Sequence, residues 1–216
     1  MIAKDTMLIF DLDGTLWDSG KEVAISWNEV LQKELPQMKP LDADYVHSVM
    51  GMTMREIADH TIIGTDEENK RRIFKECEVN EVEYLRKSGG VLFPNVKSTL
   101  ETLQNQGYTM TVVSNCQKGY IDAFMTSMDT KKYFVDFEEW GNTLRSKAEN
   151  IRLVMKRNGF EKAIYIGDTQ KDMNAATDAH VPFVHVTYGF GKVVEPFASI
   201  DDFSGLLEVI QNYNLD

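Results

Sequence analysis

The stretch Met7–Leu16, which reads MLIFDLDGTL, decides the fold of this chain. Its first four residues are apolar, and an apolar run bounded by a turn signal is typical of a buried strand in a parallel sheet. Asp11 and Asp13 follow at once, and Gly14 lets the backbone turn tightly after them. Because ligands of open α/β sheets bind outside the carboxyl ends of the strands, these two carboxylates indicate a ligand site. The alternative is a surface turn with solvated acids, since Asp and Gly are common turn residues.

The composition is that of a globular protein with an acidic surface. The 216 residues, 43% hydrophobic and 26% charged, can form one core or a core with a smaller insert. The net charge of −11 argues against a general binder of nucleic acid or membrane surfaces, but not against a small anionic substrate. Cys77 and Cys116 are too few for a disulfide framework, and we find no apolar run of membrane-spanning length. We therefore expect a cytoplasmic protein.

Two segments of different character follow the opening stretch. Residues 17–90 read as a helical insertion, with no convincing strand between Trp17 and Lys87. Within it, Thr53 with Glu56 and Thr65 with Glu68 have the spacing of capping boxes. From Val91 onward, strand-like and helical segments alternate, which predicts βαβ units and a parallel sheet.

Polar residues follow the predicted strands at the points where these strands end. Ser114 and Asn115 come after one β-rich stretch, and Asp168 comes after another. Carboxyl ends of parallel strands lie at one edge of a sheet, so we expect these residues near the two acids of the first strand. Lys147 opens the helix before the strand of Asp168, and its amine could reach the same edge.

The chemistry of this group of residues indicates phosphoryl transfer. Asp11, Asp13 and Asp168 supply a hard, oxygen-rich pocket of the kind that suits Mg²⁺. Ser114, the backbone amides after it and Lys147 could hold phosphate oxygens. The reaction that fits is covalent catalysis with an aspartate as the nucleophile.

In their order along the chain, these motifs resemble those of the haloacid dehalogenase superfamily. The likeness spans the whole chain and rests on Asp11-Leu12-Asp13-Gly14-Thr15, Ser114-Asn115, Lys147 and Gly167-Asp168-Thr169-Gln170-Lys171-Asp172. The helical insertion is similar to the small α-helical cap of the phosphoglycolate phosphatase and β-phosphoglucomutase branch. The resemblance implies an α/β fold with a Rossmann-like three-layer α/β/α core and a central parallel sheet, in residues 1–16 and 91–216. The cap would be residues 17–90, inserted after the first strand.

The resemblance also implies roles for single residues. Asp11 would attack phosphorus, and Asp13 would protonate the leaving oxygen and then deprotonate the attacking water. The Asp11 carboxylate, the backbone carbonyl of Asp13 and Asp168 would ligate Mg²⁺. Asp172 would be a further metal group, or it would only favour the start of a helix.

The remaining candidates bind the phosphoryl group or the substrate. Ser114, Asn115 and Thr15 would bind the transferring phosphoryl, and Lys147 would balance its charge. The alternatives are a turn residue for Ser114 and a solvated helix residue for Lys147. Arg55 would reach a substrate anion when the cap closes, or it is an ordinary surface arginine.

The predicted function is a Mg²⁺-dependent phosphatase that acts on a small phosphorylated metabolite, as a monomer or small homo-oligomer. The presence of Asp13 and Asp168 counts against dehalogenation. A phosphomutase of the β-phosphoglucomutase type is an alternative. The resemblance implies that such a mutase would carry a cap histidine near Val23, but the first histidine of this chain is His47. A non-catalytic protein that binds a phosphate ligand is the other alternative.

Overall fold

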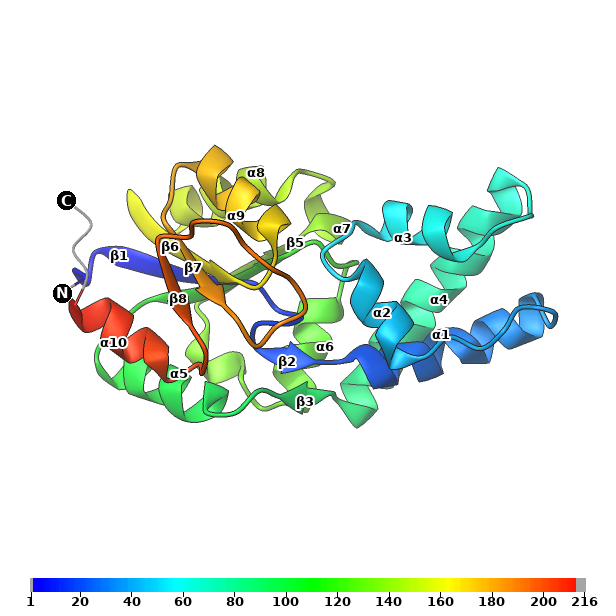
Figure 1. Cartoon of the computed structure of the whole chain (residues 1–216), viewed down its shortest axis with the longest axis horizontal. Helices are drawn as coiled ribbons and strands as arrows, with labels where there is room; N and C mark the ends of the chain where they lie inside the picture. Colours follow the sequence, from blue (N-terminus) through cyan, green and yellow to red (C-terminus); the bar gives the residue numbers. More distant parts are fainter. Residues whose placement is uncertain (1, 213–216) are drawn as a thin grey trace.

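The core of the protein is a parallel sheet. The computed structural model describes residues 2–212 (Figure 1). The strands of the sheet are β1 (Thr6–Phe10), β4 (Met110–Ser114), β5 (Asp136–Glu139), β6 (Lys162–Gly167), β7 (Phe183–Val186) and β8 (Ala198–Ile200). They lie in the order β5-β4-β1-β6-β7-β8, and every neighbouring pair is parallel. Strand β1 is therefore central, which confirms the prediction from its apolar run.

Helices cover both faces of this sheet. They are α5 (Val96–Asn105), α6 (Tyr120–Ser127), α7 (Trp140–Thr143), α8 (Lys147–Arg157), α9 (Gln170–Ala179), α10 (Gly205–Asn212) and the short 3₁₀ helix η1 (Lys131–Tyr133). Side chains alternate along a strand, so Leu8 and Phe10 of β1 face one apolar core and Met7 and Ile9 face the other. Helices α8 and α9 lie on one side of the sheet and α5 and α10 on the other (Figure 1). This arrangement confirms the three-layer α/β/α prediction.

The insertion after β1 is helical, as the sequence predicts. Its helices are α1 (Gly20–Glu34), α2 (Ala43–Val49), α3 (Met54–Thr61) and α4 (Glu67–Ser88). They lie beyond the end of the sheet at which β1 ends (Figure 1). Two short antiparallel strands, β2 (Trp17–Asp18) and β3 (Val91–Leu92), join the insertion to the core. The expectation of no strand between Trp17 and Lys87 was therefore wrong at its first two residues.

Helix starts in the insertion follow side-chain capping. Thr53 and Glu56 form the predicted capping box at the start of α3. The second predicted box, Thr65 with Glu68, is wrong. Helix α4 is capped one residue later by Asp66, whose carboxylate accepts from the Asn69 amide at 2.9 Å. Aspartate caps a helix at least as well as threonine does, and the pattern of residue types did not separate the two positions.

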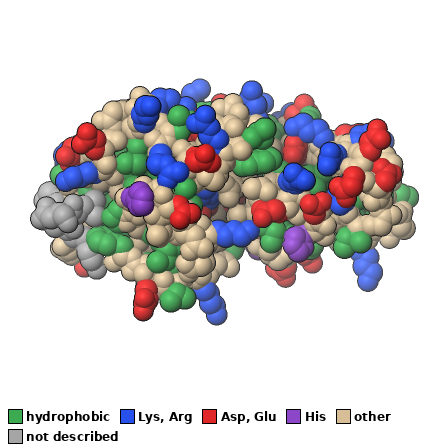
Figure 2. Space-filling view, turned by 90° about the horizontal axis from the view of Figure 1, so that it is seen from above, with side chains coloured by type: hydrophobic (Ala, Val, Ile, Leu, Met, Phe, Trp, Pro, Cys, Tyr) green, Lys and Arg blue, Asp and Glu red, His purple; other side chains and the backbone are tan. Residues whose placement is uncertain are grey.

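The surface carries both signs of charge. Acidic and basic side chains are interspersed on the face shown in Figure 2, over both the sheet and the helical insertion. Several form ion pairs, such as Arg72 with Glu34 at 2.7 Å and Arg86 with Asp122 at 2.9 Å. Within residues 2–212, the structure has no helix of the length and apolarity that a membrane crossing requires.

Candidate active site

Three carboxylates meet at the carboxyl edge of the sheet. Asp11 follows β1, Asp168 follows the neighbouring strand β6, and Asp172 lies in the first turn of α9. All three are buried, and each offers an oxygen atom within 4.8 Å of the others. The structure thus brings together three of the acids that the sequence analysis singled out.

Lys147 is the cation of this cluster. Its Nζ donates to Asp11 Oδ1 at 2.8 Å and to Asp172 Oδ1 at 2.6 Å, and the residue is only 6% exposed. Burial by itself lowers the pKa of a lysine, but Asp11 and Asp172 outweigh it and hold the pKa of Lys147 well above its usual value. The side chain is therefore a buried ammonium ion and not a solvated helix lysine.

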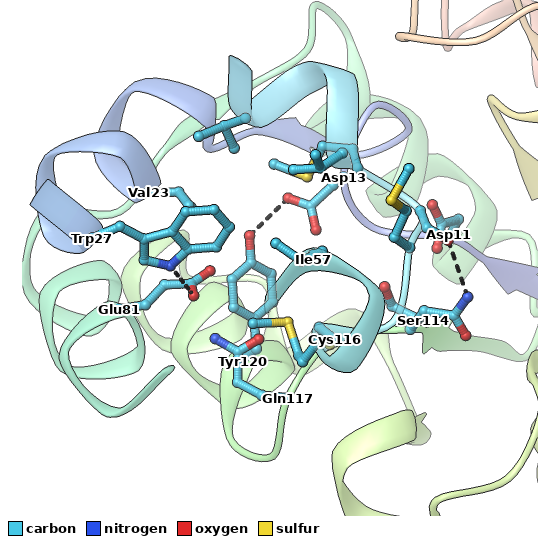
Figure 3. Close-up of a pocket in the computed structure, with 17 residues that line it drawn as sticks. Asp11, Asp13, Val23, Trp27, Ile57, Glu81, Ser114, Cys116, Gln117 and Tyr120 are labelled. Atoms are coloured by element: carbon cyan, nitrogen blue, oxygen red, sulfur yellow. Dashed lines mark hydrogen bonds between the residues drawn. The ribbon is translucent and has the colours of Figure 1, made fainter. Parts of the chain in front are cut away.

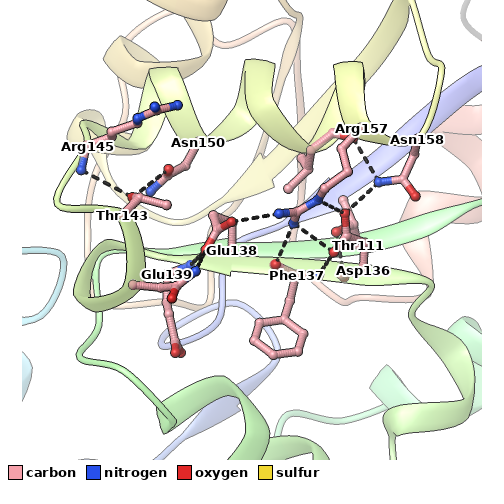
Figure 4. A network of polar contacts seen from close by, with 12 residues as sticks. Thr111, Asp136, Phe137, Glu138, Glu139, Thr143, Arg145, Asn150, Arg157 and Asn158 are labelled. Carbon is pink, nitrogen blue, oxygen red and sulfur yellow. Dashed lines mark hydrogen bonds and ion pairs between the residues drawn. The ribbon is translucent and has the colours of Figure 1, made fainter.

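A second polar network fixes the helix that carries Lys147. At the other end of α8, Arg157 donates to Asp136 at 2.7 Å and to Glu138 at 2.9 Å, both on β5 (Figure 4). Glu138 is buried, so its pairing with a guanidinium is needed to offset its desolvation. The helix is thus anchored along β5, and this anchoring fixes the position of Lys147.

Asp13 points away from the carboxylate cluster. Its Oδ1 accepts three hydrogen bonds, from Trp17 Nε1 at 2.9 Å, from the Ser19 hydroxyl at 2.8 Å and from the Tyr120 hydroxyl at 2.8 Å. Figure 3 shows the bond from Tyr120. Burial raises the pKa of Asp13 to about 6, although the three donors hold it lower than burial alone would. A carboxyl group with such a pKa exchanges its proton near neutral pH.

The electrostatics of the cluster favour a bound cation. Burial, together with the nearby Asp172, raises the pKa of Asp11 to about 7 and that of Asp168 to about 8. Asp168 Oδ2 accepts from the Phe190 amide at 2.7 Å, but its buried Oδ1 has no hydrogen-bond partner in residues 2–212. An unpartnered buried carboxylate oxygen beside another carboxylate suits a hard divalent cation. The residues therefore fit such an ion.

Asp172 starts its helix, which is one of the two roles considered for it, and it also contacts Lys147. One carboxylate oxygen accepts from Lys147, and the other accepts from Thr169 in the capping box of α9. Asp172 thus starts the helix and also orients the lysine. Because both oxygens already have partners, its role as a metal ligand stays a prediction.

The turn after Asp13 requires a glycine. Gly14 has a φ of +80°, and a Cβ there would lie 2.2 Å from Oδ2 of Asp168. Glycine thus satisfies both the backbone conformation and the close approach of two strand ends.

Two of the candidates for phosphoryl binding, Ser114 and Asn115, line the cavity over the acids of the first strand. Ser114 ends β4 and lines a cavity together with Asp11 and Asp13, as Asn115 does. The Asn115 amide also donates to the Gly51 carbonyl at 3.3 Å and so connects the core with the helical insertion.

The two remaining candidates, Thr15 and Arg55, do not line that cavity. Thr15 is fully buried, its Oγ1 has no hydrogen-bond partner within the described residues, and its carbonyl accepts from Tyr188. Arg55 is exposed and lines a separate hollow of α3 and α4 with Asp59 and Lys70. The structure does not bring Arg55 to the carboxylates.

Sequence reasoning missed the residues that hold this site in place. Buried Glu139 accepts from the amides of Gly119 at 2.6 Å and Ile121 at 3.3 Å, and so anchors the start of the helix that carries Tyr120. No local pattern marks Glu139 or Tyr120. His47, to which no role was given, lies 2.8 Å from Asp18 and stacks on Phe190.

The cavity over Asp11 and Asp13 lies between the sheet edge and the helical insertion (Figure 3). The insertion contributes Val23, Trp27, Val46, Val49, Met50, Gly51, Met52, Met54, Ile57 and Glu81, and the core contributes Asp11, Asp13, Ser114, Asn115, Cys116, Gln117 and Tyr120. Both segments are therefore needed to enclose a ligand at this point.

This fold and site define a class of protein. Residues 8–186 match the haloacid dehalogenase-like hydrolase family, and the chain belongs to that family. The phosphoglycolate phosphatase of Vibrio parahaemolyticus is 29% identical, with 97% of this chain and 98% of the relative covered. The phosphoglycolate phosphatase of Aquifex aeolicus is 27% identical, with 96% and 97% covered.

Solved structures show the same fold. A protein described as a predicted phosphoglycolate phosphatase, from Haemophilus somnus 129pt, superposes with a TM-score of 0.83 at 24% identity, over 96% of this chain and 98% of that one. A haloacid dehalogenase-like hydrolase of Streptococcus pneumoniae gives a TM-score of 0.82 at 20% identity, over 95% and 98%. At these identities the likeness concerns the fold.

Proposed function

We propose that this protein hydrolyses a small phosphomonoester through a covalent phosphoryl intermediate on Asp11. The coarser statement, that it is a phosphoric monoester hydrolase, rests on its family and on the curated relatives. The observation that carries the finer proposal is the buried Asp11 carboxylate, held by Lys147 at 2.8 Å, with Asp13 beside it in one cavity.

In the first step, a carboxylate oxygen of Asp11 attacks phosphorus, and the bond from phosphorus to the leaving oxygen breaks. Asp13 gives its proton to that oxygen. Its pKa of about 6 keeps a protonated fraction available near neutral pH. Lys147 holds the attacking carboxylate in place and offsets the negative charge of the phosphoryl group.

In the second step, the ionised Asp13 takes a proton from a water molecule that attacks phosphorus. The bond between phosphorus and the Asp11 oxygen breaks, inorganic phosphate leaves, and both acids return to their starting states. Ser114 at the end of β4 lies in the same cavity, where its hydroxyl can donate to a phosphoryl oxygen.

A divalent cation completes the proposed site. Asp11 and Asp168 would hold it, with the backbone carbonyl of Asp13, and Mg²⁺ is the ion that best fits oxygen ligands of this kind. When bound, the ion neutralises charge on the phosphoryl oxygens. The unpartnered Oδ1 of Asp168 supports this assignment.

We also assign the helical insertion, residues 17–90, as a cap over a catalytic core of residues 1–16 and 91–216. The contact from Asn115 to the Gly51 carbonyl supports an arrangement in which the cap covers bound substrate. A cytoplasmic location and a monomer or small homo-oligomer remain predictions.

The test is release of phosphate from p-nitrophenyl phosphate with Mg²⁺, compared between the natural protein, Asp11→Asn and Asp201→Asn. Asp201 is an exposed aspartate and serves as the matched control. We expect Asp11→Asn alone to abolish release. Undiminished activity in Asp11→Asn would show that Asp11 is not the nucleophile. Binding of phosphate esters without turnover would favour the non-catalytic alternative.

A further inference from the structure

The cavity over the carboxylates has a mostly apolar wall on its cap side. Val23 and Trp27 of α1, Val46 of α2 and Ile57 of α3 line it, and each is at most 6% exposed. In the mechanism proposed above, the phosphoryl group lies at Asp11, so the leaving group of the substrate points toward these side chains. An apolar wall favours a leaving group that loses little hydration on binding.

Two buried polar side chains lie beside this wall, the acid Glu81 from the insertion and the amide Gln117 from the core. Glu81 on α4 is 3% exposed and accepts from Trp27 Nε1 at 2.7 Å. Gln117 is also 3% exposed. Its Nε2 makes no hydrogen bond of good geometry within the described part of the chain, but its side chain lies near enough to Glu81 to hold the pKa of that acid lower than burial alone would. Both side chains lie in the cavity, below Trp27 in the view of Figure 3.

Glu81 supplies no positive charge to an anion in either protonation state. Burial raises its pKa to about 8, so both the neutral and the ionised form occur near neutral pH. The ionised form repels a second carboxylate, and the neutral form can donate a hydrogen bond to one but carries no positive charge. Among the described residues that line the cavity there is no lysine, arginine or histidine to pair with an anion. The buried cation of the site, Lys147, already pairs with Asp11 and Asp172.

The size of the cavity limits the leaving group. Its volume is about 40 Å³. A single water molecule needs roughly 10–15 Å³ by a comparable measure, so the cavity admits only a few heavy atoms without movement of the cap.

We propose that the substrate is a phosphomonoester of a small, uncharged alcohol, with an apolar body against the cap helices and at most one polar group near Gln117 and Glu81. This inference rests on the proposed function and adds the class of leaving group to it. It sets the chain apart from relatives named for phosphoglycolate, because glycolate carries a carboxylate. The side chains that would meet this carboxylate include the acid Glu81.

Three esters of nearly equal shape test the inference. They are phosphoglycolate, its neutral amide and isobutyl phosphate, whose leaving groups are anionic, polar and apolar. We expect kcat/KM for both neutral esters to exceed that for phosphoglycolate by at least about tenfold, because a like charge across a buried contact is costly. The natural protein with Mg²⁺ is sufficient for this comparison.

A charge placed at the rim gives a second, independent readout. Met52 lines the cavity from the loop after α2 and is half-buried, so a longer polar side chain can be accommodated there. Met52→Lys should raise kcat/KM for phosphoglycolate relative to its amide by roughly tenfold, while Met52→Gln, the neutral control, should leave this ratio unchanged.

The outcomes separate this inference from the function on which it rests. Release that depends on Asp11, with the two neutral esters preferred, supports both. If phosphate release depends on Asp11 but phosphoglycolate is hydrolysed as well as the neutral esters or better, the inference about the leaving group is overturned. The proposed phosphatase activity then still stands. A ratio that responds equally to Met52→Lys and Met52→Gln also overturns it. Absence of Asp11-dependent release from every ester, p-nitrophenyl phosphate included, overturns both.

Discussion

Replacing Tyr120 with phenylalanine removes one of the three hydrogen bonds that stabilise the ionised form of Asp13. The phenol hydroxyl donates to Asp13 Oδ1 at 2.8 Å, while the ring contacts Trp17 with centroids 5.8 Å apart. Tyr120→Phe keeps the ring contact and removes only the hydroxyl. Since the lost donor favours the carboxylate, the pKa of Asp13 should rise.

The size of this rise follows from the contacts. A hydrogen bond to a charged group contributes about 1.5–3 kcal/mol, and one pKa unit corresponds to about 1.4 kcal/mol. The Ser19 hydroxyl lies 2.8 Å from both Asp13 Oδ1 and the Tyr120 hydroxyl, so it offsets part of the loss. We therefore expect the pKa of Asp13, about 6 in the natural protein, to rise by about one unit.

The assay is the pH profile of kcat/KM at saturating Mg²⁺, with an alkyl phosphate whose poor leaving group needs a proton. Asp13 acts as the acid in the first step, so its ionisation sets the alkaline limb of the profile. In Tyr120→Phe this limb should move about one unit toward higher pH. Tyr108→Phe is the control, since that hydroxyl donates to the remote Ile2 carbonyl. An alkaline limb that stays in place in Tyr120→Phe, or that moves equally in the control, would refute the reasoning.

Three further predictions concern stability. Lys147→Met leaves buried Asp11 without its cation and should lower the free energy of unfolding at neutral pH by about 3 kcal/mol. An unchanged midpoint of urea unfolding would contradict this prediction. The pKa of Glu81 is raised from 4.5 to about 8, so the stability that its proton contributes is full below pH 4.5 and is lost as the pH rises through about 8. Glu81→Gln should therefore reduce the loss of stability between pH 4.5 and pH 8 by up to about 4 kcal/mol. Urea unfolding that shows an equal loss in the natural protein and the variant would count against this prediction. Mg²⁺ at about 100 times its Kd should stabilise the natural protein by about 2.7 kcal/mol. Asp168→Asn should remove most of this gain, measured by thermal unfolding. If Asp168→Asn keeps the gain, Asp168 does not hold the ion.

The part of the site that the sequence predicts lies at the ends of strands. Met7–Phe10 marks a central strand, and the residues that follow β1, β4 and β6 meet because parallel strands end at one edge. Lys147 could be placed in the same way, since its helix leads back to β6. For these residues, their place at the end of a strand or at the start of a helix is enough to predict which edge of the sheet they reach.

The remaining residues act through contacts between distant parts of the chain, which local patterns do not encode. Tyr120 reaches Asp13 across a separation of 107 residues, and Glu81 reaches Trp27 across 54. Glu139 lies in an acidic stretch that resembles a solvated loop, but the structure buries it under the start of α6. Burial distinguishes these side chains from ordinary surface residues, and burial is a property of the folded chain.

The most direct test of the account is rapid chemical quench with p-nitrophenyl phosphate that carries ³²P in its phosphoryl group. If Asp11 is the nucleophile, the denatured protein retains label as an acyl phosphate, a bond that hydroxylamine cleaves. Asp11→Asn should retain none, while Asp13→Asn should retain more, because the water that removes the phosphoryl group then lacks its base. Label that persists in Asp11→Asn, or turnover by the natural protein without any bound label, would contradict the account.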